Sequence, residues 1–160
     1  MKRILMLFAC LLGLGLTLPA SAVDYAVPAD PVALQQLRDR LKTDRKGVIS
    51  ENMKLSETEA SHFWPLYGAF QRELEVLGSR RTTTLLELIQ ANGTVTEANA
   101  QRMYSELNAI AAADAELRQR YFAKFAKAIT PIKATRYYQI EARISALNRL
   151  DENFAIPLVH

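Results

Sequence analysis

The short stretch Ile129-Thr130-Pro131 constrains the fold most, because it ends one long helical pattern and begins another. The Thr130 hydroxyl can accept a hydrogen bond from a first-turn amide, and proline suits the first helical position because no donor is needed there. Apolar residues then recur at three- and four-residue steps, at Tyr137, Ile140, Ile144 and Leu147. Three charged residues are expected to lie largely off this stripe, namely Lys133, Glu141 and Arg149. The pattern predicts a sharp corner between two helices, the second of which needs a partner for its stripe.

A long helix is expected to begin after Ser56. Ser56 and Glu59 have the spacing of a capping box, in which each side chain bonds the other residue's backbone amide. A helical stripe then continues for about nine turns, or about 50 Å. Its members are Phe63, Leu66, Phe70, Leu74, Leu77, Leu85 and Leu88. Pro65 lies near the start of this helix, so we expect a bend between Ser61 and Pro65 but no break, because the stripe continues.

Asn92-Gly93 interrupts the helical pattern, and Thr94 with Glu97 has the spacing of a second capping box. A second long stripe follows, at Met103, Leu107, Ile110, Leu117, Tyr121 and Phe125. This helix is expected to run to about Ile129 and the next from Pro131 to about Leu150, ahead of an apolar tail over residues 154–159. No alternating strand pattern competes. The predicted fold class is therefore all-α: a long antiparallel helical hairpin plus a C-terminal helix, elongated in shape.

The N-terminus has the pattern of a secretory signal peptide. Lys2 and Arg3 precede a 15-residue apolar run over residues 4–18, and Ala20-Ser21-Ala22 is typical of a cleavage site. The alternative is an uncleaved membrane anchor, but the run is shorter than the roughly 20 residues that span a bilayer. We therefore expect residues 1–22 to be removed, a periplasmic location, and no membrane span after cleavage.

Residues 23–50 are expected to form a mobile N-terminal segment with one short helix. Asp30-Pro31 marks its start, and Lys46-Gly47 its end, because glycine tolerates the left-handed cap. Residues 51–160 then form the helical hairpin domain.

Charge and cysteine content limit the choice of partners and cofactors. Removing Lys2 and Arg3 from the 20 basic residues leaves 18 against 17 acidic residues, a net charge of +1. No basic run interleaved with aromatic residues is present, so no nucleic-acid partner is expected. Cys10 lies in the signal, so the processed chain has no cysteine for a disulfide or a thiolate metal site.

No motif predicts catalysis. The sequence has no Gly-x-Ser-x-Gly elbow and no phosphate-binding glycine loop, so we expect neither an enzyme nor a bound cofactor. Glu59-x-x-His62 has the spacing of half a carboxylate-bridged di-iron site, but no second such pair exists. His160 and His62 alone do not specify a zinc site, so no metal ligands are assigned.

Two clusters are candidates for binding a client or partner protein. The first is the densest aromatic patch and comprises Phe63, Trp64, Leu66 and Tyr67; the second comprises Arg136, Tyr137 and Tyr138. Tyrosine and tryptophan give large contact areas in binding surfaces. Core packing beside Pro65 is the alternative interpretation of the first cluster. Helices this long in a short chain cannot all cover one another, so an exposed apolar face, used for homodimerisation or client binding, is also expected.

Two helix starts resemble the motifs of a known family. Leu55-Ser56-Glu57-Thr58-Glu59 and Ile129-Thr130-Pro131-Ile132-Lys133 are similar to the Leu-Thr-x-x-Gln motifs of the periplasmic Spy/CpxP group, with a long hairpin between them. Serine stands in place of the first threonine, and Glu59 and Lys133 stand in place of the glutamines. Residues 63–67, 136–141 and 156–158 also resemble a family of secreted proteobacterial helical proteins without assigned activity.

The resemblance implies a cradle-like antiparallel dimer and three possible roles. The first is an ATP-independent periplasmic chaperone or envelope-stress accessory protein that binds unfolded or envelope proteins. The second is an adaptor or regulator of one specific envelope protein, such as a sensor kinase. The third is a metal-linked stress protein, although this chain lacks the histidine-rich segments of the zinc-linked members.

Overall fold

A computed structural model describes residues 30–160, apart from the side chain of Asp151, and this part of the chain is all-helical, as predicted. The predicted signal peptide and the start of the processed chain lie outside the described residues. The helices are α1 (Pro31–Thr43), α2 (Arg45–Met53), α3 (Glu57–Gln90), α4 (Glu97–Ala128) and α5 (Pro131–Ala155). None of the helices in residues 30–160 is both long enough and apolar enough to cross a membrane.

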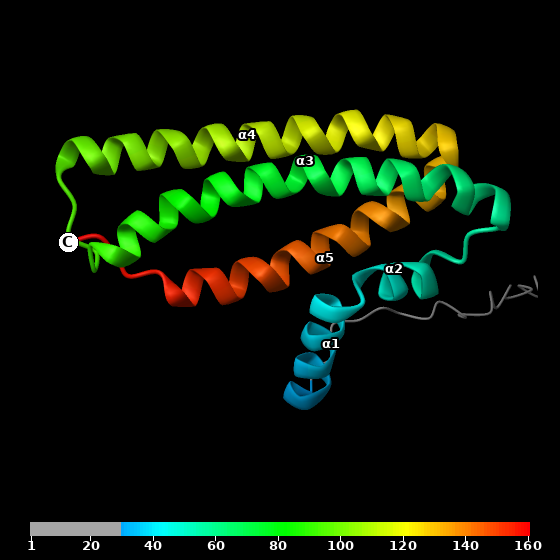
Figure 1. Ribbon diagram of the computed structural model, residues 1–160, viewed down its shortest axis with the longest axis horizontal. Coiled ribbons are helices and arrows are strands. Elements are labelled where there is room, and N and C mark those ends of the chain that lie inside the picture. The colour runs from blue at the N-terminus through cyan, green and yellow to red at the C-terminus, as the bar shows by residue number, and fades with distance from the viewer. Residues whose placement is uncertain (1–29) are drawn as a thin grey trace, which may run out of the picture.

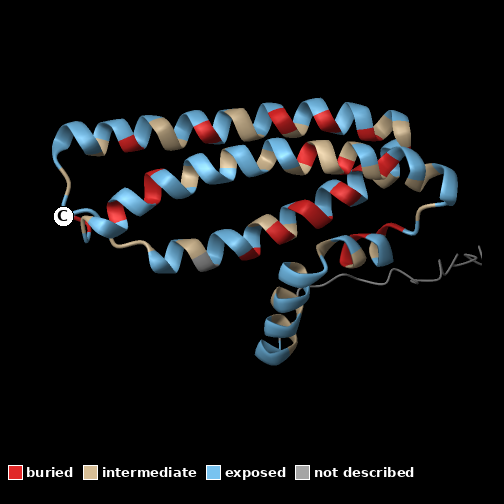
Figure 2. Ribbon diagram, viewed as in Figure 1, coloured by how far each residue is buried: buried red, intermediate tan, exposed pale blue. Residues whose placement is uncertain are grey.

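The long helices form an open, elongated layer (Figure 1). α3 and α4 pack side by side as an antiparallel hairpin, α5 returns along α4, and α2 packs on α5. Helix α1 projects away from this body. Buried residues face inward and gather most densely where α2, α3 and α5 meet (Figure 2). The central cluster includes Ile49, Met53, Phe63, Phe70, Leu117, Tyr121, Phe125, Tyr137, Ile140 and Ile144.

The capping signals locate two helix starts correctly. Ser56 Oγ accepts a hydrogen bond from the Glu59 amide at 3.2 Å, and Glu59 Oε2 accepts one from the Ser56 amide at 2.8 Å. Thr130 Oγ1 accepts from the Lys133 amide at 3.2 Å, and Pro131 is the first residue of α5. α3 continues through Pro65, as the uninterrupted apolar stripe predicts. The bend expected between Ser61 and Pro65 stays a prediction.

Two other boundary predictions are wrong. The N-cap of α4 is Thr96, which accepts from the Asn99 amide at 3.3 Å, and not Thr94. Thr94 belongs to the turn, because its amide donates to the Ala91 carbonyl at 3.0 Å. At the other end of the chain, α5 extends to Ala155 and not only to Leu150.

The prediction of a single short helix ending at Gly47 is also wrong. Asp44 separates α1 from α2, and its carboxylate accepts a hydrogen bond from the Gly47 amide at 2.9 Å. A Cβ at position 47 would lie 2.0 Å from Asp44 Oδ2, so the glycine makes room for a cap inside the helix and does not end it. Val48, Ile49 and Met53 of α2 are buried, and the predicted domain boundary at residues 50 and 51 falls within α2.

The turn between α3 and α4 holds the C-terminal tail. Gly93 has φ of +82°, and its carbonyl accepts a hydrogen bond from the His160 amide at 3.1 Å. The Thr94 hydroxyl lies 3.2 Å from His160 Nε2. The tail that follows α5 therefore contacts the distant turn and joins the ends of the long helices.

Gly93→Ala is expected to lower the free energy of unfolding by about 1–3 kcal/mol, because alanine is strained at positive φ. Its Cβ would also lie 2.3 Å from the Leu158 carbonyl oxygen. Gly78→Ala is the matched control, since nothing lies within 4 Å of a Cβ placed there in α3. That change should stabilise the protein by about 0.5–1 kcal/mol. Urea unfolding followed by circular dichroism measures both; equal effects of the two changes would contradict this account of the turn.

Candidate functional site

Three of the seven predicted binding residues lie in the core. Phe63, Tyr67 and Tyr137 are buried, and the Phe63 ring centroid lies 5.1 Å from that of Tyr137. Core packing, the alternative considered for the first aromatic cluster, therefore describes Phe63 and Tyr67. Together with Phe125, whose ring centroid is 4.7 Å from that of Tyr137, these side chains join α3, α4 and α5. They are core residues and not parts of an accessible surface.

The other four predicted residues do not share one face. Trp64 and Leu66 are partly buried beside the core, and Lys46 of α2 lies over the Trp64 ring, 5.3 Å from its centroid. Arg136 is exposed and donates a hydrogen bond to the Asn52 carbonyl of α2 at 3.3 Å. Tyr138 lies elsewhere, in a groove between α4 and α5. The structure thus places Trp64 and Arg136 against α2 and separates them from Tyr138.

A buried polar network that the sequence did not reveal joins α2, α3 and α5. Glu141 is only 1% exposed, although it was expected to lie off the apolar stripe. Its Oε2 lies 2.6 Å from the Arg45 guanidinium, and its Oε1 accepts hydrogen bonds from Gln71 and from the Tyr137 hydroxyl, both at 3.2 Å. A buried carboxylate requires such partners, because leaving it unpaired would be costly. The sequence offered one signal for this network: Glu141 lies four residues after Tyr137, a spacing at which two helical side chains can contact each other.

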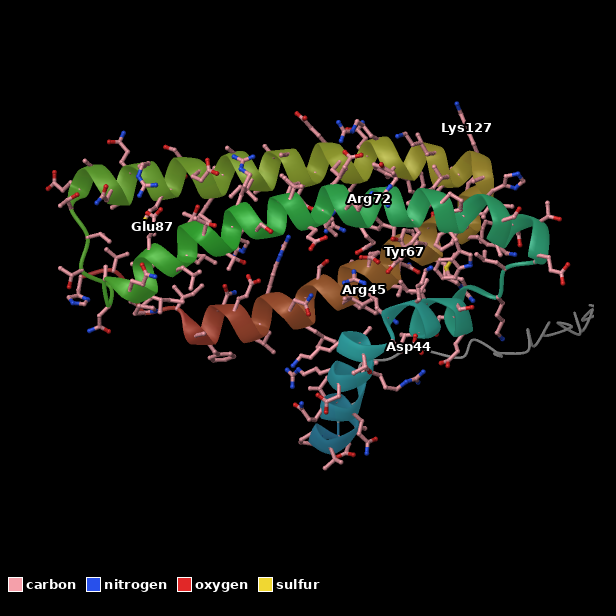
Figure 3. The ribbon with its side chains drawn as sticks, in the orientation of Figure 1. Asp44, Arg45, Tyr67, Arg72, Glu87 and Lys127 are labelled. Carbon is pink, nitrogen blue, oxygen red and sulfur yellow. The ribbon has the colours of Figure 1, made fainter. Side chains whose placement is uncertain are left out.

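The tyrosines beside this network remain protonated and can donate hydrogen bonds. Burial raises the pKa of Tyr137, and the neighbouring Glu141 carboxylate raises it further. Burial also raises the pKa of Tyr67, which lies close to Arg45 between α2 and α3 (Figure 3). Glu141, Arg45, Gln71 and Tyr137 bond one another, while the buried Nε of Arg45 has no hydrogen-bond partner among the described residues. The arrangement suits fixing three helices rather than chemistry.

The two motif-like helix starts meet in space. Lys133, at the start of α5, forms an ion pair with Glu59, at the start of α3. Lys133 Nζ also lies 3.4 Å from the Lys54 carbonyl oxygen. Glu59 and Lys133 are the residues that replace the two glutamines of the resembled motifs, so these replacements contact each other.

Glu59→Gln is expected to weaken the dependence of stability on acidic pH. The hydrogen bond from Lys133 holds the pKa of Glu59 below its ordinary value of 4.5. The contact therefore stabilises the protein fully above the unfolded-state pKa, and this stability is lost as the pH falls through the lower folded-state pKa. Thermal unfolding between about pH 2 and 6 should show a smaller change in Tm for the variant. An unchanged slope would contradict the prediction.

Among residues 30–160, no group of three or more His, Cys, Asp or Glu side chains is arranged to hold a metal ion. His62 is exposed on α3, while its predicted partner Glu59 is paired with Lys133. His160 lies against the turn beside Thr94. The two histidines singled out in the sequence are thus at separate places on the molecule.

The groove between α4 and α5 is the most suitable binding surface among those described. It has a volume of about 730 Å³, and Phe122 and Tyr138, which line it, are 39% and 48% exposed. Its other apolar lining consists of small residues, Ala115, Ala142 and Ala146. Charged residues stand beside it, among them Arg118, whose Nε lies 2.9 Å from Asp114 Oδ2. Sequence reasoning missed Phe122, because it lies off the stripe formed by Tyr121 and Phe125.

A second groove, between α3 and α4, has a volume of about 1030 Å³ and is lined mainly by charged and polar residues. Ion pairs cross it between Arg80 and Glu106, at 2.8 Å, and between Arg102 and Glu87. No aromatic side chain lines this groove, in contrast to the groove between α4 and α5.

Comparison with known proteins gives no relative from which a role can be taken. No protein-family model, curated protein or solved structure matches this chain.

Proposed function

We propose that this chain is a periplasmic, ATP-independent binding protein that holds apolar segments of unfolded or envelope proteins in the groove between α4 and α5. The observation that supports this proposal is the pair of exposed aromatic side chains, Phe122 and Tyr138, over a lining of alanines. The small residues leave space for a ligand, while the aromatic rings supply large apolar area at low entropic cost.

The charged surroundings suit weak and adaptable binding. Arg118 and Arg149 line the groove and both lie close to Asp114, so the three side chains together carry one net positive charge that can steer an encounter while the rings hold the client. The sequence contributes the compartment through its predicted signal peptide, and it offers no glycine loop that would bind a nucleotide. These features support binding without an energy source.

The test is suppression of aggregation of a chemically unfolded client, without nucleotide. The protein is expressed with its own N-terminus and recovered from the periplasm, and its mass establishes whether residues 1–22 have been removed. Phe122→Ser combined with Tyr138→Ser should weaken client affinity about tenfold. Tyr104→Ser is the matched control, since Tyr104 is a 71% exposed aromatic residue on α4 that does not line the groove. Equal loss in both variants would overturn the assignment of the groove.

An adaptor for one specific envelope protein, such as a sensor kinase, is the second candidate. Trp64 favours it, because a partly exposed tryptophan against α2 is the kind of single anchor on which a specific interface depends. Trp64→Phe would then abolish binding of one partner captured from the envelope and leave suppression of client aggregation unchanged.

We also propose a homodimer, which light scattering at micromolar concentrations tests; a monomer mass throughout that range would contradict it.

A further inference from the structure

A third cavity lies where α3, α4 and α5 come apart. α5 diverges from α3 as it leaves the corner at Pro131 (Figure 1). The cavity is lined by Leu77 of α3, Ile110 of α4 and Ser145 of α5, together with Arg45 of α2, and we refer to it as the three-helix crevice. Its volume is about 300 Å³, which is at the small end of the range for sites that bind small molecules.

Part of the crevice wall is apolar and incompletely covered. Leu74 and Leu77 of α3 line it together with Ile110 of α4, and the two leucines are only partly buried. Gly78 lies between them and Arg81 in the lining, and nothing is found within 4 Å of the position of its absent Cβ. A small apolar body placed here would remove leucine surface from water, which is favourable.

The rest of the wall is rich in arginine. Helices α2, α3, α4 and α5 each contribute one arginine to the lining, and these are Arg45, Arg81, Arg118 and Arg149. Two carboxylates line it as well, those of Asp114 and Glu152, so the lining carries a net charge of 4 − 2 = +2. Glu141, which pairs with Arg45 from outside the lining, lowers this to +1. Arginines that converge from four helices differ from the scattered charges of one solvated helix face.

Several guanidinium donors in the crevice are not used by the fold. Arg81 donates from Nε to Glu152 at 3.0 Å, which leaves its two terminal nitrogens without a partner among residues 30–160. The nearest carboxylate oxygen to Arg149 belongs to Asp114 and lies 3.7 Å away, beyond hydrogen-bond distance. The buried Nε of Arg45 has no partner within the described part of the chain. Because an unpaired buried donor is costly, a bound acceptor would be favourable.

We propose that the three-helix crevice binds a small amphiphilic carboxylate, such as a medium-chain fatty acid. The planar carboxylate is held by Arg81 and Arg149, since a guanidinium can bond both oxygens at once. The apolar chain covers Leu74, Leu77 and Ile110. A neutral apolar molecule would leave the donors unpaired, and a small inorganic anion would leave the leucines uncovered.

This inference goes beyond the proposed function, which concerns the groove between α4 and α5. The two cavities share Arg118 and Arg149, but Arg81 lines only the crevice. Octanoate binding needs no client, so its absence would leave the client groove untouched. A protein that fails to suppress aggregation could still bind octanoate.

The test is titration calorimetry of the full protein, recovered from the periplasm, with octanoate. Octanol and acetate are the control probes, because octanol lacks the charge and acetate lacks the chain. Octanoate should bind saturably and at least about tenfold more tightly than either control. Absence of saturable octanoate binding would overturn the proposal, and so would equal binding of octanol or of acetate.

Replacing one arginine of the crevice tests the site itself. Arg81→Gln should weaken octanoate binding about tenfold, because it removes a charged donor from the head group. Arg80→Gln is the matched control: Arg80 is the adjacent arginine, it is also paired, with Glu106 at 2.8 Å, and it lines the groove between α3 and α4 instead. That variant should bind octanoate as the original protein does. Equal weakening in both variants would mean that overall charge, and not the crevice, sets the affinity.

Two further variants locate the apolar chain. Gly78→Leu keeps every charge and adds a side chain beside the crevice, so it should also weaken octanoate binding about tenfold; an unchanged affinity would contradict the assignment. Phe122→Ser combined with Tyr138→Ser should leave octanoate binding unchanged. A loss in that double variant would place the ligand in the client groove and overturn the proposal. Circular dichroism verifies that each variant is folded.

Discussion

Replacing Phe63 with alanine is expected to lower the free energy of unfolding by about 3–5 kcal/mol. Phe63 is fully buried, and its ring centroid lies 5.0 Å from that of Trp64, 5.1 Å from that of Tyr137 and 5.2 Å from that of Phe125. These neighbours lie on α3, α4 and α5, so a cavity at Phe63 would weaken contacts among all three helices. Helix-propensity differences are far smaller than this packing loss.

Chemical unfolding followed by circular dichroism measures this loss. Phe154→Ala is the matched control, because the same side chain is 85% exposed near the end of α5. Its effect should stay within about 0.5 kcal/mol. If Phe63→Ala costs no more than Phe154→Ala, the aromatic cluster does not hold the three helices together. Client binding by Phe63→Ala should be compared only where the variant is still folded.

Replacing Glu141 with alanine is expected to cost about 3 kcal/mol, at the lower end of the range for breaking a buried ion pair. The loss leaves Arg45 without its partner and removes the acceptor used by Gln71 and Tyr137. The Arg45 side chain is partly exposed, so water can compensate part of its charge. Unfolding in urea at neutral pH measures the cost.

A double variant separates two quantities: the destabilisation caused by leaving one charge unpaired, and the net contribution of the ion pair to stability. Arg45→Met combined with Glu141→Leu removes both charges while keeping similar volume, and its stability should return to within about 1 kcal/mol of the original protein. Arg45→Met alone should be nearly as damaging as Glu141→Ala, because it leaves the buried carboxylate unpaired. If the double variant is as unstable as the two single variants added together, the network stabilises the fold through more than charge pairing.

The long helices could be predicted because their signals are local. Ser56 and Thr130 act within one turn of the chain, and so their capping bonds appear where the sequence places them. The Asn92-Gly93 break is also local, since both residues adopt positive φ. The cap at Thr96 was missed because Thr94, an equally suitable residue, is already used by the turn and by His160.

The candidate site was harder to predict, because burial depends on which helices meet. Tyr137 lies on the stripe of α5, and its place beneath α3 could not be told from a place on the surface until α3 was positioned. Glu141 looked like a solvated residue because its partner, Arg45, is 96 residues away in the chain. Gly47 was interpreted as a helix end. In the structure it lies inside α2, where the lack of a Cβ leaves room for the side chain of Asp44.

The separation between Arg45 and Glu141 also has a consequence for the order of folding. Contacts between α3 and α4 close only a short loop and can form early, whereas α2 can dock only after α5 has supplied Glu141 and its apolar neighbours. Loss of the ion pair should therefore accelerate unfolding while leaving the folding rate almost unchanged. During biosynthesis α2 leaves the ribosome before the long helices, yet we expect it to be among the last parts of the chain to dock.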